Sequence, residues 1–136
     1  MEFFALTICF KRHIFGGEVV GMYEIEFYDL EYGSTPVKEF LDALDPKMKA
    51  KTLRTIDLLE QNGPRLRLPY SGSLGNGLFE LRVRQGSDIT RVLYFFFIGK
   101  KVVLTNGFTK KTQKTPPAMM ELARRYKADY ERRFGR

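Results

Sequence analysis

Arginine and lysine form the clearest pattern of residues in this chain that could do chemistry. They gather around three apolar stretches in the second half of the sequence. Guanidinium groups offer paired donors that match the oxygens of a phosphate, and ammonium groups add compact positive charge. On one surface, such groups would hold a phosphodiester and stabilise the charge that develops at phosphorus during cleavage. The candidates are Arg82, Arg84, Arg91, Lys110, Lys111 and Lys114.

Alternation along a predicted strand places the arginines on one face of a sheet. From Leu78 onward, the apolar residues 79, 81 and 83 point one way, whereas Glu80, Arg82 and Arg84 point the other. We expect the apolar side to face helices, so that the arginines face outward. Arg91 lies near the start of the next strand, where a hairpin register would bring it beside them. The alternative interpretation is a solvated face with screened charges and nothing bound.

Further residues extend this predicted RNA-binding surface. Arg65 and Arg67 precede the sheet within the same basic part of the chain. Aromatic rings near the cations could hold a splayed base, although most of them, taken singly, are more typical of a core. These rings belong to Tyr70, Phe79, Tyr94 and Phe108.

The charge distribution agrees with a basic sheet. The 136 residues carry a net charge of +7, which points to a polyanionic partner. Residues 64–115 hold ten basic and two acidic residues, net +8, whereas residues 22–63 hold five basic and nine acidic, net −4. Cys9 is the only cysteine and His13 the only histidine, which excludes an intrachain disulfide and argues against a zinc site or a histidine-based triad. We therefore expect a cytoplasmic protein that uses no metal and no cofactor.

Residues 1–21 differ from the rest of the chain. Their apolar stretch, 3–10, precedes Lys11 and Arg12, the reverse of the order in a secretory signal, and it is too short to span a bilayer. We interpret 1–21 as an extension that is not native, with Met22 as the natural start and 22–136 as the domain. The alternative is a genuine extra strand or arm.

The remaining pattern predicts an α+β domain. Residues 23–28 alternate as a strand, and helices are expected to begin at Pro36 and Pro46, the first behind a hydroxyl cap at 34–35 and the second behind Asp45. Strands are expected at 78–84, 89–98 and 101–108, with an additional short one near 67–70, before a helix that opens at 115–117. The resulting architecture is a strand, a helical hairpin on a small, mostly antiparallel sheet, and a C-terminal helix.

Three motifs resemble a known family. Leu78–Arg82, Arg91–Tyr94 and above all Gly107–Pro116 are similar to the signature of the phage-derived, HigB-like branch of the RelE/ParE toxin superfamily. The resemblance implies the same RelE-like fold. It also implies a ribosome-dependent, metal-independent endoribonuclease that acts on messenger RNA in the ribosomal A site. The implied partner is a helix-turn-helix antitoxin that represses the shared operon, so operator DNA would be reached only through the antitoxin and no membrane is involved.

The resemblance also implies roles for single residues. The basic residues that relatives use in cleavage correspond here to Arg91, to Arg82 and Arg84, and to Lys110 or Lys111. From the residues themselves, we expect Arg91 and Arg82 to stabilise the phosphate and Lys110 or Lys111 to serve as acid or orienter. The residues expected to bind RNA are Arg84, Phe108, Lys114, Arg65 and Arg67. Glu80 is a candidate general base, with an ion pair to Arg82 or Arg84 as the alternative role. Some relatives have lysine where this chain has Glu80, and a tyrosine near the positions of Pro116 and Pro117. These departures leave the identity of the base open.

Two other functions remain open at this point. A ParE-like gyrase inhibitor shares the fold but needs no phosphate chemistry. A catalytically inactive protein could use the same basic face to bind an acidic partner. The cluster of Arg82, Arg91, Lys110 and Lys111 argues against the inactive protein without excluding it.

Overall fold

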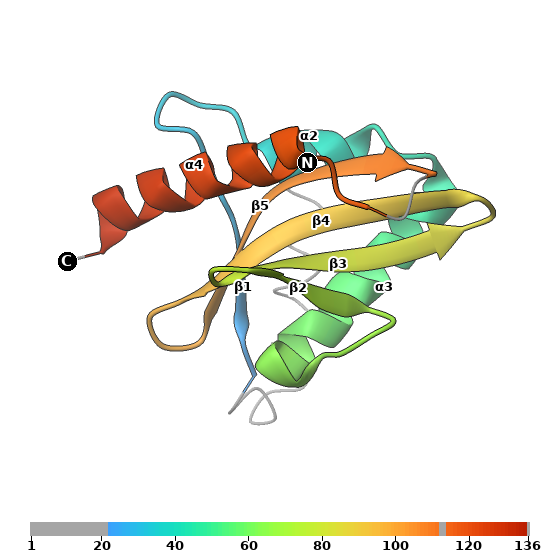
Figure 1. The fold of residues 1–136 in the computed structure, drawn as a ribbon, viewed down its shortest axis with the longest axis horizontal. Helices are drawn as coiled ribbons and strands as arrows, with labels where there is room; N and C mark the ends of the chain where they lie inside the picture. Colours follow the sequence, from blue (N-terminus) through green and yellow to red (C-terminus); the bar gives the residue numbers. More distant parts are fainter. Residues whose placement is uncertain (1–21, 112–113, 136) are drawn as a thin grey trace.

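The computed structural model describes residues 22–111 and 114–135, so the segment 1–21 lies outside the described residues. The strands are β1 (Glu24–Phe27), β2 (Ser71–Gly75), β3 (Leu78–Gln85), β4 (Asp88–Phe97) and β5 (Lys101–Lys110) (Figure 1). The helices are α2 (Pro36–Asp42), α3 (Pro46–Asn62) and α4 (Pro117–Phe134), and a short 3-10 helix, η2 (Gly63–Arg65), follows α3. The predicted α+β class and order of elements are confirmed.

The strands form one mixed sheet in the order β1-β5-β4-β3-β2. β1 runs parallel to β5, and all other neighbours are antiparallel. The short strand expected near residues 67–70 begins at Ser71 instead. The N–H groups of Tyr70 and Ser71 both donate to the carbonyl of Arg67 and close a turn there, so pairing with β3 starts only after the turn.

The two helices of the first half begin where their prolines predicted. Asp45 caps α3, since its side chain accepts a hydrogen bond from the N–H of Met48 at 2.8 Å. The hydroxyl cap expected for α2 is not formed. Thr35 occupies the capping position, but its hydroxyl donates to the carboxylate of Asp29 and so ties the loop before α2 together.

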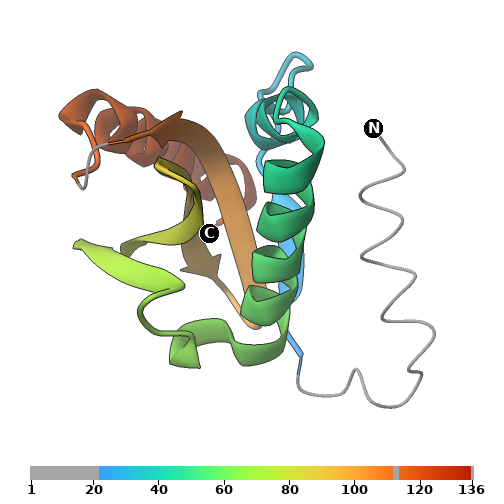
Figure 2. The ribbon, with the colours of Figure 1, turned by 90° about the vertical axis from the view of Figure 1, so that its right-hand side faces the viewer.

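Helices α2 and α3 cover one face of the sheet, and α4 lies on the other (Figure 2). Phe40 of α2 fits against β5 only because position 107 is glycine. A Cβ there would lie 2.6 Å from the Phe40 ring. The core between these layers consists of Val37, Leu41, Ile56, Leu59, Leu81, Val92, Tyr94, Val102 and Leu104.

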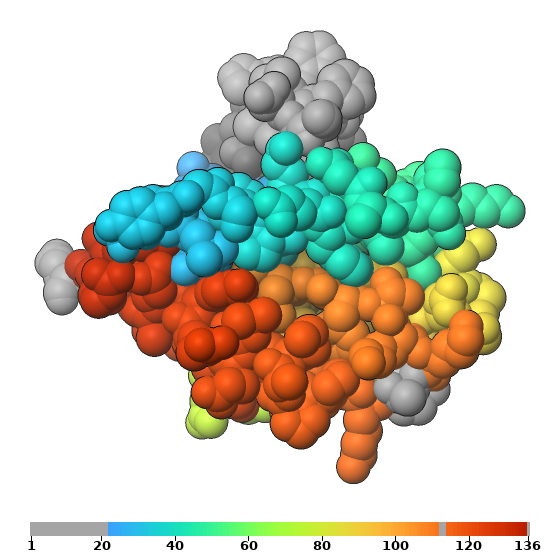
Figure 3. Space-filling model, turned by 90° about the horizontal axis from the view of Figure 1, so that it is seen from above, coloured from blue at the N-terminus to red at the C-terminus, as the bar shows by residue number. Residues whose placement is uncertain are grey.

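The face that carries the arginines does not simply point outward as predicted, because α4 covers part of it. Ala123 of α4 packs with Leu78, Leu93 and Phe108, and Tyr130 packs with a second buried cluster nearer the other end of the helix. Seen from above, α4 (red) and the segment around α2 (cyan) lie on either side of β5 (orange) (Figure 3). The part of the arginine face beyond the start of α4 is the part that can meet a ligand.

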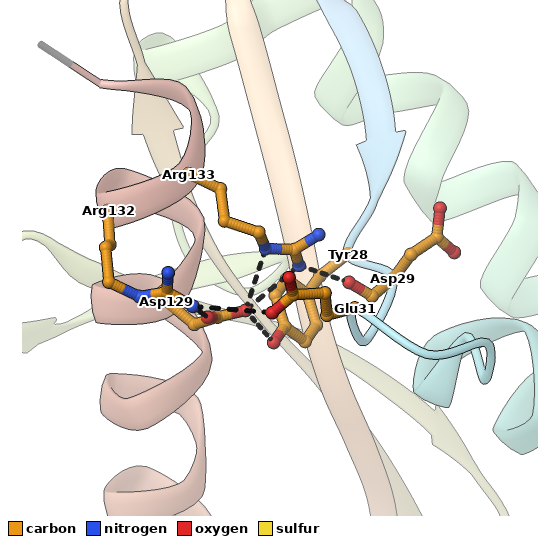
Figure 4. A network of polar contacts seen from close by, with 6 residues as sticks. All are labelled: Tyr28, Asp29, Glu31, Asp129, Arg132 and Arg133. Carbon is orange, nitrogen blue, oxygen red and sulfur yellow. Dashed lines mark hydrogen bonds and ion pairs between the residues drawn. The ribbon is translucent and has the colours of Figure 1, made fainter.

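Polar contacts fix the C-terminal half of α4 to the segment that follows β1 (Figure 4). The hydroxyl of Tyr28 donates to Asp129 at 2.6 Å, and Arg133 pairs with the same carboxylate at 2.9 Å. Arg133 also donates to the backbone carbonyl of Asp29. Burial, followed by the bond to Asp129, raises the pKa of Tyr28 to about 12, whereas the Tyr28 bond and the neighbouring arginines lower the pKa of Asp129. This network anchors α4 over the sheet.

Candidate nucleic-acid interface

Strand pairing aligns the predicted site residues in rows across the arginine face. In antiparallel strands, residues directly opposite one another point to the same side of the sheet. One row contains Arg82, Arg91 and Phe108, and the next contains Arg84, Ile89 and Lys110. The hairpin register that the sequence suggested for Arg91 is therefore the one observed.

A buried carboxylate holds the two central arginines. Glu80 is 1% exposed, and its Oε2 accepts from Nε of Arg82 at 2.8 Å. Its Oε1 lies 3.6 Å from Nε of Arg91 and also accepts from the hydroxyl of Thr115. The expected ion pair of Glu80 thus involves Arg82 and Arg91, not Arg84. Both carboxylate oxygens are engaged, which suits an anchor for cations.

The two arginines differ sharply in exposure. Arg91 is 1% exposed, and its guanidinium carbon lies 5.7 Å from the ring centroid of Phe108. Burial lowers the pKa of Arg91, Glu80 opposes that shift, and neighbouring Arg82 and Arg84 add to it. The side chain of Arg82, by contrast, is 37% exposed. Arg91 therefore supplies a fixed charge from within the protein, and Arg82 is the partner that a ligand can reach.

Beside these arginines lies a cleft of about 500 Å³ between α3, the loop before β2 and the free edge of β3. Four cations line it, and no acidic residue is among the residues described along its walls. The cations are Lys51, Arg82, Arg84 and Arg91. The apolar part of the wall comes mainly from Leu68, Pro69, Tyr70, Val83 and Ile89.

A second hollow of about 500 Å³ lies on the other side of Arg82. It runs between β2 and the connection from β5 to α4, and Glu80, Lys114 and Thr115 contribute to its lining. Arg82 lines both hollows. An extended polyanion that crossed this surface would therefore meet Arg82 at the junction.

The other predicted residues are dispersed around this centre. Lys110 is exposed on the row of Arg84, whereas Lys111 pairs with Asp88 at 2.8 Å beside the β3–β4 turn. Arg65 and Arg67 are exposed in the connection between α3 and β2, outside the residues that line either hollow.

The four candidate aromatic rings separate into two groups. Tyr94 is buried in the core on the opposite face of the sheet, where Phe79 stacks on it at 5.6 Å between ring centroids. Phe108 is only 8% exposed and lies beneath Arg91. Tyr70 is the most exposed of the four, at 45%, and it lines the cleft.

Sequence reasoning missed two contributors to the site. Lys51 projects from α3, in the segment with net negative charge, and its Nζ donates to the carbonyl of Arg84 at 2.6 Å. Its spacing of four residues from Thr55, which also lines the cleft, is the one available signal that both share a helix side. Thr115 was interpreted only as part of a helix start, but its hydroxyl completes the coordination of Glu80.

Among the helices of residues 22–111 and 114–135, none is long and apolar enough to cross a membrane. Within the same ranges, no three His, Cys, Asp or Glu side chains gather where they would hold a metal ion.

The fold and this cleft define a small α+β protein with a basic, arginine-centred surface. The chain belongs to the family described as phage derived protein Gp49-like (DUF891), whose model matches residues 39–128. This match confirms the phage-derived, HigB-like resemblance that the motifs indicated. No curated protein matches the chain.

A solved structure is also similar to this chain, the archaeal RelE–RelB complex from Pyrococcus horikoshii OT3. The similarity extends over 68% of this chain and 99% of that one, at 18% identity and a TM-score of 0.45.

Proposed function

We propose that this protein is the toxin of a toxin–antitoxin pair and cleaves messenger RNA on the ribosome, in the cytoplasm. Membership of the Gp49-like family supports the class. The observation that carries the proposal is the buried Glu80, which holds Arg82 and Arg91 beside a cleft lined by cations. A rigid set of guanidinium groups at a cleft wall is what charge stabilisation at a phosphate requires.

The proposed reaction is an internal transfer at the scissile phosphate. The 2′-oxygen forms a bond to phosphorus and the bond to the 5′-oxygen breaks. The proton of the 2′-hydroxyl passes to solvent water, and a lysine ammonium delivers a proton to the leaving oxygen. Arg82 contacts the phosphate, and Arg91 stabilises its growing charge from within the protein. Lys110 is the better candidate for the acid, because the ammonium of Lys111 is held by Asp88. Glu80 acts as a positioning residue, since both of its oxygens are engaged by neighbouring donors.

Brief induced expression followed by mapping of RNA ends tests the proposal. We expect new ends inside translated messages, each with a 5′-hydroxyl, together with growth arrest. The variant R82A should lower cleavage about 100-fold or more, because a removed transition-state donor costs that much. R54A on α3 removes the same charge from an exposed residue outside the cleft lining and serves as the matched control. DNA breaks with intact RNA would instead indicate a gyrase inhibitor, and full cleavage by R82A would overturn the proposed site.

The proposed partner is a helix-turn-helix antitoxin, which would also connect this protein to operator DNA. Co-expression of the neighbouring reading frame should restore growth, and the two proteins should purify together. Growth arrest that persists beside that neighbour would exclude it as the antitoxin.

A further inference from the structure

We propose that the cleft beside Arg82 binds one nucleotide of single-stranded RNA, with its base on Tyr70 and its phosphate toward Lys51 and Arg84. The inference rests on the proposed function in taking RNA as the ligand, and it adds a subsite that holds a nucleotide next to the scissile bond.

The apolar end of the cleft is unusual for a surface. Leu68 is 65% exposed and Tyr70 is 45% exposed, and both line the cleft together with Pro69. Their backbone is nevertheless well held. The N–H of Tyr70 donates to the carbonyl of Arg67 at 3.0 Å, and the N–H of Arg82 donates to the carbonyl of Tyr70 at 2.8 Å. A partly exposed aromatic side chain on a well-held backbone is a platform on which nucleobases can stack.

One of the cations that line the cleft, Arg82, lies close to its apolar end. Gly72 of β2 shows the spacing, because a Cβ built there would lie 3.5 Å from a terminal nitrogen of Arg82 and 3.7 Å from Cδ2 of Leu68. The guanidinium and the apolar loop therefore lie side by side. A ligand in the cleft contacts an apolar surface and positive charge together, as a nucleotide with its base and phosphate requires.

The balance of charge in the cleft favours an anion. Four cations line it, and two of them, Arg82 and Arg91, share the single negative charge of Glu80. Lys51 is held at the wall by its bond to the carbonyl of Arg84, a contact that leaves its charge uncompensated by any acid in the lining. The remaining excess is about three positive charges, two of which are those of Lys51 and Arg84.

The geometry selects single strands over duplexes. A base can lie on one exposed ring only after it leaves its own stack, which single-stranded RNA permits at little cost. A duplex would present phosphates to the cations but no free base to Tyr70. Base stacking and phosphate binding can therefore be separated by experiment.

A tryptophan reporter tests the stacking directly, because the chain contains no tryptophan. In the variant Y70W, we expect a mixed-sequence 2′-O-methyl RNA decamer, which cannot be cleaved, to quench the indole fluorescence strongly. The same RNA as a duplex should quench it weakly. Y32W is the matched control, since Tyr32 is 93% exposed in the loop before α2 and lies outside the cleft lining. Its fluorescence should not respond to either RNA.

Affinity measurements by anisotropy provide a second readout that does not depend on the reporter. Replacing Tyr70 with alanine should weaken binding of the decamer about fivefold to a hundredfold, the range that loss of one stacked base produces. Y70F should retain near wild-type binding, because it keeps the ring. K51M should weaken binding, whereas R54M, which removes a charge from the same helix outside the cleft, should not.

Two outcomes would overturn this inference. Binding of the decamer without quenching in Y70W would place RNA elsewhere, and equal quenching by duplex RNA would make the cleft a phosphate site without stacking. These results are distinguishable from failure of the proposed function. Messenger cleavage that persists unchanged in Y70A and K51M would reject the subsite alone, whereas strong quenching without any cleavage in cells would reject the nuclease and keep the subsite.

Discussion

The carboxylate of Glu80 is shared between one arginine that solvent can reach and one that it cannot. Arg82 is 37% exposed on its side-chain surface, whereas Arg91 is 1% exposed. Removing one partner of a buried ion pair leaves the other charge poorly compensated, which costs far more than loss of an exposed pair. The two arginines should therefore have similar effects on catalysis and different effects on stability.

We predict that R91A lowers the free energy of unfolding by about 3 kcal/mol, the cost typical of a broken buried pair. R82A should lower it by less, because Arg91 remains to compensate the buried Glu80 and the lost charge is itself partly solvated. Urea denaturation followed by circular dichroism measures both values. The double variant E80Q/R91M removes the two buried charges together, so it should regain much of the stability and still fail to cleave RNA. If R91A proves as stable as wild type, the pair contributes nothing to the fold.

At the scale of elements, the position of α4 depends on a small set of polar contacts far from the cleft. Tyr28, Asp129 and Arg133 join the C-terminal half of the helix to the segment after β1 (Figure 4). α4 in turn covers Leu93 and Phe108, which lie beside and beneath the buried arginine. The anchor of the helix is thus part of what holds the site in place.

These contacts predict that the thermal stability of the fold depends on pH. The pKa of Asp129 is lowered in the folded protein, chiefly by the bond from Tyr28, so its stabilising contribution is present at neutral pH and is lost as pH falls below the ordinary value of 3.8. D129N should melt at a lower temperature than wild type at pH 7, and the difference should shrink in acid. Thermal melts between about pH 3 and pH 7 would reveal the convergence. A constant difference across this range would exclude ionisation of Asp129 as the source.

The stability of the fold at alkaline pH provides a control on the same contacts. The pKa of Tyr28 is raised from 10.0 to about 12, so its contribution is fully present below pH 10 and is lost as pH rises toward 12. Y28F cannot lose a proton, so it should show a smaller decline over that interval than wild type.

At the scale of the whole molecule, the charge is divided between a basic sheet and an acidic first half. This division predicts that RNA binding is strongly dependent on salt. With about three phosphates neutralised, the logarithm of the affinity should fall with the logarithm of salt concentration at a slope near −2, and R84A should reduce that slope by about 0.7. Anisotropy titrations of the uncleavable decamer at several salt concentrations measure the slope. An unchanged slope in R84A would show that Arg84 makes no phosphate contact.

Much of this molecule was predictable from short-range patterns. Alternation placed Glu80 and Arg82 on one face, and the turn after β3 set the register that brings Arg91 opposite Arg82. Patterns of this length carry no information on which element covers which face. The covering of that face by α4, and with it the burial of Arg91, could not be foreseen. Lys51 was missed for the same reason, because only the tertiary packing of α3 brings it to the cleft.

The parallel pairing of β1 with β5 has a consequence for folding during synthesis. β1 leaves the ribosome early, yet β5, its neighbour in the sheet, ends at Lys110. Until that late strand emerges, β1 lacks its pairing with β5 and Arg91 lacks the ring of Phe108 beneath it. Contacts so distant in sequence form last. The packing around Arg91 in a nascent chain is therefore completed only near the end of translation, after β5 has been made.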